Sequence, residues 1–542
     1  MVSTKLFDTV IIGAGWSGAV AARELSAKGY SVLVLEGRDR IGGRAQTWTD
    51  KGKGDVKVDV GCSWIHGYKE GNPARDIAQE LGVAAHLPKP AESLIYGPDG
   101  VLSNSAAAAL RASLSAAQSS FKTPHPPPPP SASLASALFS SNSPLYTSSA
   151  SPDQSADVTN TSPADPTHAA DAAATAPAGE NDLVAALART LEIPLGLKLE
   201  KASLRWAGWE TTTSFAGSDA APEGGYEALV TKVMTQAESQ GAVVHLQTII
   251  KNFQLDENNI SVSATNGDRY SAKTAICTLP LGVLKKLPES AFDPPLPPRM
   301  VESIKGTHVG VLEKLLLHYP SAWWPEAEKV GSYTFLPTTS PPTDSSSPDE
   351  IFAGSALVCA NFACPTLPNA ATTLLTYLSE TPATLLLRHP PAAVAKSYHQ
   401  FLISRFKPSK PPPEPLEFNL STWLTDPFSY GATTTPSIVS EKGERSPMDF
   451  KELSRPVWGG RLGFAGEHTE MEHRGSVAGA VPCRLLTPTL KNLTGPESAF
   501  DLMTVDVDEQ PEVAAKYDIS ALPTVVAFRA GKPVNRFEQS AY

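Results

Sequence analysis

A glycine-rich turn between a strand and a helix, close to the start of the chain, constrains the fold more than any other feature. The apolar run Thr9-Val-Ile-Ile12 predicts a strand, residues from about Ser17 to Lys28 an amphipathic helix, and Ser31-Val-Leu-Val-Leu35 a second strand. Gly13-Ala-Gly15-Trp-Ser-Gly18 joins the first strand to the helix. This order is typical of a βαβ unit that binds a dinucleotide, and it predicts an α/β domain with a doubly wound, Rossmann-like sheet.

The turn and its surroundings carry groups that suit a dinucleotide. The first glycine permits a tight turn, the second lets the backbone approach a pyrophosphate, and the third lets helix and strand pack closely. Trp16 and Ser17 open the helix, whose free amides and positive dipole end favour phosphate. Glu36 ends the second strand, where a carboxylate can accept hydrogen bonds from ribose hydroxyls. A glycine turn in an unrelated α/β fold is the alternative.

The residues after Glu36 favour a cofactor whose pyrophosphate is neutralised by arginine. Three arginines and a glycine pair follow within Gly37-Arg38-Asp-Arg40-Ile-Gly42-Gly43-Arg44. Guanidinium groups bind phosphate oxygens in pairs, and glycines let the chain pass close to the ligand. We therefore expect Gly37, Arg38, Gly43 and Arg44 to contact the cofactor, with a basic surface turn as the alternative.

Charge and cysteine content limit the classes of binding partner and the cellular compartment that we expect. The chain has 45 basic and 56 acidic residues, a net charge of −11, which argues against a nucleic-acid partner but suits a cationic small substrate. The 5 cysteines form no C-x-x-C pair, and their odd number argues against a secreted disulfide framework. We find no signal peptide, no membrane span and no Ser-Lys-Leu ending, and expect a cytoplasmic protein.

Two regions depart from the composition of an ordinary globular domain. Residues 103–180 are rich in Ala, Ser, Pro and Thr and poor in aromatic side chains, so we expect a disordered insertion there. Pro482 ends the last helical pattern, and residues 498–542 resemble the second half of a thioredoxin domain, with Leu522-Pro523-Thr524 where that family has its cis-proline. The thioredoxin dithiol would lie upstream, and this chain offers none there.

Further motifs follow the dinucleotide fingerprint in a fixed order, and together they resemble the flavin amine oxidase superfamily. They cover most of residues 7–481 outside the insertion and read Glu36-Gly-Arg-Asp-Arg-Ile-Gly-Gly-Arg44, Asp59-Val-Gly-Cys-Ser-Trp-Ile-His-Gly67, Asn72-Pro73, Thr278-Leu-Pro-Leu-Gly-Val-Leu284, Phe292-Asp-Pro-Pro-Leu-Pro297, Glu313-Lys314, Asp426-Pro-Phe-Ser-Tyr-Gly431 and Phe464-Ala-Gly-Glu-His-Thr469. The segment Ser63-Trp-Ile-His-Gly67 is similar to the polyamine oxidase branch, which includes spermine and spermidine oxidases.

The resemblance implies two domains: a doubly wound FAD-binding domain built from separated segments, and an α+β substrate domain with a mixed sheet. We expect the FAD-binding segments at residues 1–95, 221–288 and 421–481, and the substrate segments at residues 181–220 and 289–420. Ala432 stands where monoamine oxidases carry the cysteine that attaches their flavin, so non-covalent FAD is expected. The resemblance extends the cofactor contacts to Gly61, Ser63, Trp64, Ile250, Gly466, Glu467, Ser476 and Val477.

Lys314 and His66 are the catalytic residues that the resemblance implies. The matching lysine of the family holds a water against the reactive flavin nitrogen, whereas the alternative is a lysine paired with solvent or Glu313. His66 could hydrogen-bond the substrate amine or lower its protonation, or it could be an ordinary core or surface histidine. Glu210 and Trp423 are expected to contact the substrate; a solvated carboxylate and a core tryptophan are the alternatives.

The implied reaction is oxidation of a carbon next to a secondary amine nitrogen to an imine, which water hydrolyses while oxygen is reduced to hydrogen peroxide. The implied partners are a small polyamine and oxygen, with no metal, nucleic acid or membrane; the oligomeric state stays open. Two other functions are also considered. One is oxidation of a monoamine or a methylated lysine, and the other is a flavin-binding or ligand-binding protein without turnover.

Overall fold

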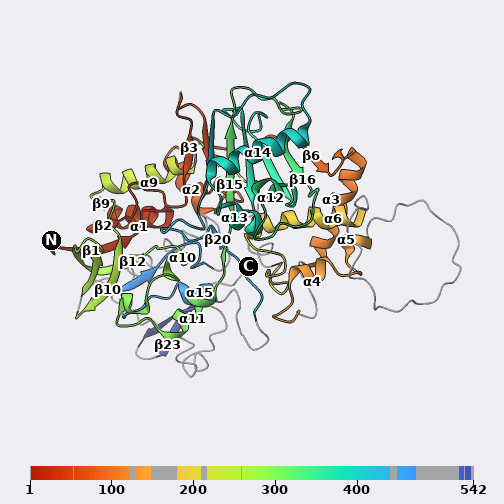
Figure 1. The fold of residues 1–542 in the computed structure, drawn as a ribbon. Helices are drawn as coiled ribbons and strands as arrows, with labels where there is room; N and C mark the ends of the chain where they lie inside the picture. Colours follow the sequence, from red (N-terminus) through yellow and green to blue (C-terminus); the bar gives the residue numbers. More distant parts are fainter. Residues whose placement is uncertain are drawn as a thin grey trace. The chain divides into compact units, whose positions relative to one another are not determined.

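The computed structural model describes residues 2–52, 54–121, 128–147, 180–208, 217–257, 259–439, 449–470, 524–529 and 532–538. The chain divides into two compact units, Met1–Cys483 and Arg484–Tyr542. Two large sheets organise the described residues of the first unit (Figure 1).

The first sheet has eight strands and a parallel centre. Its strands in spatial order are β13 (Phe292–Asp293), β10 (Ile250–Asp256), β11 (Asn259–Ala264), β12 (Arg269–Cys277), β1 (Val2–Ile12), β2 (Val32–Leu35) and β9 (Val243–His245), while β21 (Leu462–Phe464) also pairs with β12. Strands β9, β2, β1, β12 and β21 run parallel. The helix α1 (Trp16–Ala27) connects β1 to β2, so the βαβ unit forms as the sequence predicts.

Alternate residues of β1 enter different cores, because successive side chains of a strand point to opposite faces. Val10 and Ile12 pack in a cluster with residues of β10, β11 and β12, whereas Ile11 packs against α1 and α9 (Tyr226–Ser239). The sheet is therefore buried on both faces, as a parallel sheet requires. Further short helices near the first core are α10 (Leu281–Leu284), η2 (Glu289–Ala291), α11 (Pro298–Gly306) and α15 (Asp449–Leu453).

The second sheet has seven strands and is mixed. Its order is β19 (Glu417–Leu420), β15 (Glu313–His318), β18 (Thr373–Leu378), β17 (Leu357–Asn361), β16 (Val330–Phe335), β6 (Glu92–Gly97) and β7 (Gly100–Val101). Only the β16–β6 pair is parallel. Leu315 and Leu317 of β15 pack in a core with the helices α12 (Pro348–Ala353), α13 (Glu380–Leu386) and α14 (Pro391–Phe406).

Small elements complete the described first unit. The antiparallel pairs are β3 (Thr47–Thr49) with β4 (Lys57–Asp59), β5 (Ala85–His86) with β8 (Ala221–Pro222), and β14 (Val309–Gly310) with β20 (Thr433–Thr434). The helix α2 (Pro73–Glu80) begins after Asn72, whose side chain accepts hydrogen bonds from the first-turn amides of Ala74 and Arg75. Among the described helices, none has the length and apolar character that a bilayer crossing requires.

The expected disordered insertion at 103–180 is wrong for the residues that the structure describes. They form α3 (Asn104–Phe121), α4 (Leu134–Leu138) and α5 (Pro144–Thr147). Ala107, Leu110 and Ala117 of α3 are buried in a core shared with α6 (Glu180–Ala188), η1 (Arg189–Leu191) and α7 (Glu192–Leu195). Alanine has the highest helix propensity, and a few leucines suffice for a buried stripe. Residues 148–179 lie outside the described residues.

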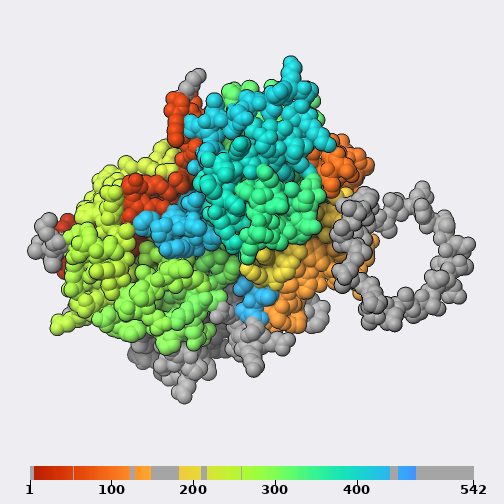
Figure 2. All heavy atoms as spheres, viewed as in Figure 1, coloured from red at the N-terminus to blue at the C-terminus, as the bar shows by residue number. Residues whose placement is uncertain are grey.

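The helical segment lies beside the second sheet (Figure 2, orange next to green and cyan). Ile95 of β6 and Leu336, which follows β16, belong to the same core as α3. The contact places these helices against the second sheet.

Two expected domain boundaries also differ from the observed pairing. Strand β6, expected in the FAD-binding segment of residues 1–95, pairs with β16 in the second sheet. Strand β13 and helix α11, expected in the substrate segment of residues 289–420, join the first sheet and its core through Phe292, Met300 and Ile304. Prolines or glycines lie near both crossings, at Pro88 and Pro90 and at Gly306 and Gly310, but they do not show which sheet the next element joins.

The second unit contains one described hairpin. Strands β22 (Thr524–Arg529) and β23 (Lys532–Glu538) pair antiparallel. Both lie in the segment expected to resemble the second half of a thioredoxin domain.

Candidate functional site

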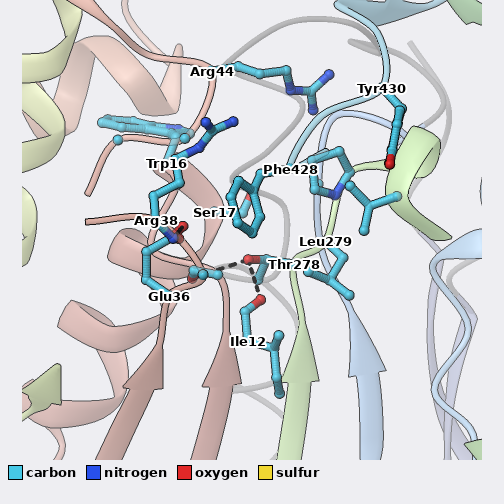
Figure 3. A pocket seen from close by; sticks show the side chains of 18 of the residues that line it. Ile12, Trp16, Ser17, Glu36, Arg38, Arg44, Thr278, Leu279, Phe428 and Tyr430 are labelled. Atoms are coloured by element: carbon cyan, nitrogen blue, oxygen red, sulfur yellow. Dashed lines mark hydrogen bonds between the residues drawn. The ribbon is translucent and has the colours of Figure 1, made fainter. Parts of the chain in front are cut away.

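A cavity of about 430 Å³ lies at the carboxyl ends of β1 and β2 (Figure 3). In doubly wound sheets this is where ligands bind. The lining comes from three separated stretches, within residues 12–62, 248–287 and 427–468. Twelve of the residues expected to bind the cofactor line it: Gly13, Gly15, Trp16, Ser17, Glu36, Gly37, Arg38, Gly43, Arg44, Ile250, Gly466 and Glu467.

The glycine turn holds helix α1 against the strands. Gly13 has φ +104°, and a Cβ there would stand 2.5 Å from the Thr278 hydroxyl. A Cβ at Gly18 would stand 2.0 Å from the Gly13 carbonyl, so only glycine allows this approach. Gly18 packs without lining the cavity. Gly15 caps α1 without a side-chain hydrogen bond, which leaves first-turn amides for a ligand.

Glu36 fixes the turn that follows β2. Its carboxylate accepts hydrogen bonds from the Ala14 amide at 2.7 Å and from the Arg38 amide at 2.8 Å, one through each oxygen. The residue is 6% exposed and lines the cavity. Each carboxylate oxygen has a further lone pair, so Glu36 can also accept from a ribose hydroxyl.

The three stretches of the lining, 12–62, 248–287 and 427–468, form the first, second and third walls of the cavity. Arg38 links the first wall to the third. Its Nη1 donates to Asp426 Oδ2 at 2.7 Å, and its guanidinium lies 5.1 Å from the ring centre of Phe428. The Phe428 ring also closes over Gly37, where a Cβ would stand 2.6 Å from a ring carbon. Figure 3 shows Arg38 and Phe428 at the cavity together with Tyr430 and Thr278.

Arg44 makes a second link between the same walls. Its Nη1 donates to the Ala432 carbonyl at 2.8 Å and to Glu467 Oε1 at 3.0 Å, while Thr434 donates to Glu467 Oε2 at 2.7 Å. Burial opposes ionisation of Glu467, but Arg44, His468 and Thr434 together hold its pKa below the usual value. Glu467 is therefore an anion at neutral pH.

The cavity residues fit a phosphate-bearing dinucleotide. Among the described residues, 14 buried side-chain polar atoms lack a hydrogen-bond partner, and 4 of them belong to the cavity residues Trp16, Arg38 and His468. Buried polar groups are normally paired, so the four unpaired atoms on residues that line the cavity are available to a ligand there. The guanidinium groups of Arg38 and Arg44 and the amides of α1 suit the pyrophosphate, and Glu36 suits the ribose.

Lys314 lies behind this cavity rather than on its lining. Its Nζ donates to the Asp59 carbonyl at 3.0 Å, the Gly61 carbonyl at 2.6 Å and Ser63 Oγ at 2.7 Å. These three acceptors use all three ammonium protons. In this arrangement Lys314 links β15 to the segment that carries Gly61 and Ser63. The role implied by the resemblance is to hold a water, and that water would have to displace one of these acceptors.

Burial governs the ionisable groups around Lys314. It lowers the pKa of Lys314 to about 8 and raises the pKa of Asp59 to about 6. It also raises the pKa of Cys62, whose thiol lines the cavity, to about 12. Cys62 is therefore a neutral thiol at neutral pH and a poor nucleophile.

His66 is an exposed residue held by a carboxylate. Its Nδ1 lies 2.9 Å from Asp219 Oδ2, and the other Asp219 oxygen accepts from the Gly67 amide at 3.0 Å. Asn72 donates to the His66 carbonyl at 2.8 Å. A carboxylate that accepts from Nδ1 places the proton there and leaves Nε2 as the acceptor nitrogen. His66 is not among the residues that line the cavity.

The remaining expected residues divide into two groups. Trp423 is 5% exposed and donates from Nε1 to the Val60 carbonyl at 3.1 Å, and neither it nor the half-buried Trp64 lines the cavity. Glu210, Ser476 and Val477 lie outside the described residues.

Several cavity residues were not expected from the sequence. Thr278, which donates to the Ile12 carbonyl at 2.8 Å, is one of them, and Phe428, Tyr430 and His468 are others. All four belong to motifs that carry the family resemblance, so the motifs were visible but not the side chains that face the ligand. Within the described ranges, no group of three or more His, Cys, Asp or Glu residues could hold a metal ion.

The fold and the cavity together define a dinucleotide-binding protein with a second, mixed sheet. The chain belongs to the flavin containing amine oxidoreductase family, whose model matches residues 16–482. FAD is accordingly its cofactor, as expected. A thioredoxin family model matches residues 480–541, which confirms the resemblance of the tail.

Curated relatives fall into two groups. The chain is 27% identical over 477 residues to lysine-specific histone demethylase 1 homolog 1 of Arabidopsis thaliana, covering 87% of this chain and 50% of the relative. It is 24% identical over 482 residues to polyamine oxidase 3 of Oryza sativa subsp. japonica, covering 88% of each. The chain thus spans about half the length of the demethylases that it matches.

A solved structure shares the fold. A double mutant of a putrescine oxidase, redesigned in its cofactor binding, has a TM-score of 0.60 and 18% identity, covering 88% of this chain and 96% of that one. At this identity the likeness shows the two-domain fold alone.

Proposed function

We propose that the protein is a polyamine oxidase, which uses FAD and oxygen to oxidise a carbon next to a secondary amine nitrogen. When bound, FAD supplies the hydride acceptor that amino-acid side chains lack. The imine product is hydrolysed by water, and oxygen is reduced to hydrogen peroxide. Cytoplasmic polyamines are the proposed pool, in line with the location expected from the sequence.

One observation carries the substrate class. The rice polyamine oxidases match this chain along most of their own length, 88% and 86%, whereas the demethylases match over about half of theirs. The net charge of −11 agrees with a substrate that carries several positive charges.

His66 has the geometry of a group that handles an amine proton. Because Asp219 accepts from Nδ1, the free Nε2 can accept a hydrogen bond from a substrate ammonium, and its side chain is 59% exposed. Only an uncharged amine readily releases hydride, so a base close to the amine favours the reactive form. Asp219 stabilises the imidazolium that results.

A second candidate is oxidation of a methylated lysine side chain. The 27% identity to the Arabidopsis histone demethylase homolog over 87% of this chain favours it. A lysine side chain and a polyamine share the same reacting group, an alkyl amine, so the cofactor cavity suits both. They differ in whether the rest of the substrate is a small cation or a peptide.

The test is anaerobic mixing of the FAD-loaded protein with spermine, N-acetylspermine, a monoamine and a dimethyl-lysine peptide in separate cuvettes. Rapid loss of the visible flavin absorbance with a polyamine is expected, and the fastest substrate identifies the branch. Faster bleaching by the peptide would favour demethylation instead. A yellow protein that no amine bleaches would refute both and favour a binding protein.

His66→Gln tests the proposed proton acceptor. We expect kcat/KM for the best polyamine to fall about a hundredfold, in line with the usual contribution of a general base. His389→Gln is the matched control, because His389 is half-buried and does not line the cavity. Equal activity of the two variants would show that His66 is not the proton acceptor. It would not change what the bleaching test says about the substrate class.

A further inference from the structure

His468 lies in the cofactor cavity, in the loop that follows β21. It is 1% exposed. The loop is fixed by its own backbone: Thr469 donates from its amide to the Gly466 carbonyl at 3.0 Å, and the Gly466 amide donates to the Thr469 hydroxyl at 3.1 Å. The imidazole folds back over Gly466, where a Cβ would stand 2.6 Å from the ring carbon Cε1. The ring position thus depends on a glycine at 466.

Neither ring nitrogen of His468 has a hydrogen-bond partner among the described residues. His399 differs, because its Nδ1 pairs with the Tyr319 hydroxyl at 2.9 Å and its Nε2 lies 3.7 Å from Glu414 Oε2. An unpaired buried imidazole costs stability, which the fold recovers only when a partner arrives. Because His468 lines the cavity, a group that fills the cavity can supply this partner.

The electrostatic surroundings select the kind of partner. Burial lowers the pKa of His468 to about 4, against a smaller opposing effect of Glu467 and with a contribution from Arg44 in the same direction as burial. A neutral imidazole offers one donor and one acceptor. It suits a hydroxyl or amide, which can both donate and accept, better than a phosphate, which only accepts.

We infer that His468 is a further cofactor-binding residue, whose imidazole would hydrogen-bond a neutral polar group of FAD. The inference concerns the cofactor alone. It holds or fails independently of which amine the enzyme oxidises, because its test measures FAD release without a substrate.

The test compares His468→Leu with wild type in the full-length protein. Diluted FAD-loaded protein releases free FAD, whose fluorescence gives the dissociation constant. We expect about a tenfold weaker FAD affinity for His468→Leu, the effect of one lost hydrogen bond of average strength. His308→Leu is the control, because His308 is also a largely buried histidine with an unpaired Nε2 but lies outside the cavity lining.

A second readout separates binding from folding. In the FAD-free protein, His468→Leu removes two unpaired polar atoms, so its thermal unfolding temperature is expected to rise above that of wild type. A structural role for the ring would lower it instead. A weaker FAD affinity combined with a higher unfolding temperature of the FAD-free protein is expected of a residue that binds the cofactor rather than stabilises the fold.

His468→Gln keeps hydrogen-bonding capacity and is expected to bind FAD within about threefold of wild type. If Gln weakens binding as much as Leu does, the ring's shape matters and its polar atoms do not, which overturns the inference. Unchanged affinity in His468→Leu, or an equal loss in His308→Leu, overturns it as well.

Discussion

Replacing Lys314 with methionine tests how burial acts on the lysine behind the cavity. In the folded protein its pKa is lowered from 10.5 to about 8, chiefly by burial. Between these two values the unfolded chain binds more protons at this residue than the folded protein does. Stability therefore rises with pH across this window, because the cost of burying the ammonium is relieved as the lysine loses its proton.

The size of the effect follows from the two pKa values. A shift of about 2.5 units corresponds to about 3 kcal/mol, all of which is a cost below pH 8. Between pH 7 and pH 9.5 the relief amounts to about 2 kcal/mol. The three hydrogen bonds from Nζ offset this cost, so removing the lysine is still expected to destabilise the protein by about 2 kcal/mol or more at pH 7.

The assay is urea unfolding of wild type, Lys314→Met and the control Lys396→Met at several pH values from 7 to 9.5. Lys396 is an exposed residue of α14. The difference in unfolding free energy between wild type and Lys314→Met should grow by about 2 kcal/mol as the pH rises, whereas the control should track wild type. A constant difference across this range would refute the reasoning, since it would mean that Lys314 does not titrate differently in the folded protein.

Three further predictions concern the cofactor. Glu36→Ala should weaken FAD binding by about tenfold or more, because it removes two hydrogen bonds that shape the turn and an acceptor for the ribose; fluorescence titration measures it, and unchanged affinity contradicts it. Gly18→Ala should prevent stable FAD binding, because the new Cβ would collide with the Gly13 carbonyl, whereas Gly463→Ala has open space and should retain FAD; visible absorbance of the purified variants decides between them. Acid precipitation should leave the flavin in solution, since Ala432 offers no sulfur for attachment; a yellow pellet would show a covalent bond.

The features of the fold and site that the sequence predicts are local. The helix expected at about 17–28 is α1 (Trp16–Ala27), because a strand, a glycine turn and a helix are adjacent in the chain. The FAD cofactor is confirmed through the family match, and the cavity lining includes the expected residues Gly13, Gly15, Gly37, Arg38, Gly43 and Arg44. Because these residues are close together in the sequence, local structure alone determines much of their arrangement in space.

What the sequence does not predict depends on contacts between distant segments. His468 follows β21, which pairs with β12, the neighbour of β1, and Phe428 meets the first wall through Arg38 and Gly37. Composition alone misassigns α3, since alanine and serine are common in both disordered segments and helices, and burial of Leu110 requires partners from α6. The sequence identifies Lys314 as a charged residue in an apolar run. It does not predict that the three hydrogen-bond acceptors of its ammonium group lie on residues 59–63.

The wide separation of the cavity's three walls has a consequence for how the holoenzyme is made. Strand β1 pairs with β12 across some 265 residues, and the third wall ends at His468. A chain leaving the ribosome therefore carries the fingerprint glycines long before it carries Phe428 or Glu467. The first βαβ unit alone lacks the partners that close the cavity, and non-local pairing of this kind forms slowly. We therefore expect FAD to bind late in biogenesis and to stabilise chains in which the third wall has been synthesised.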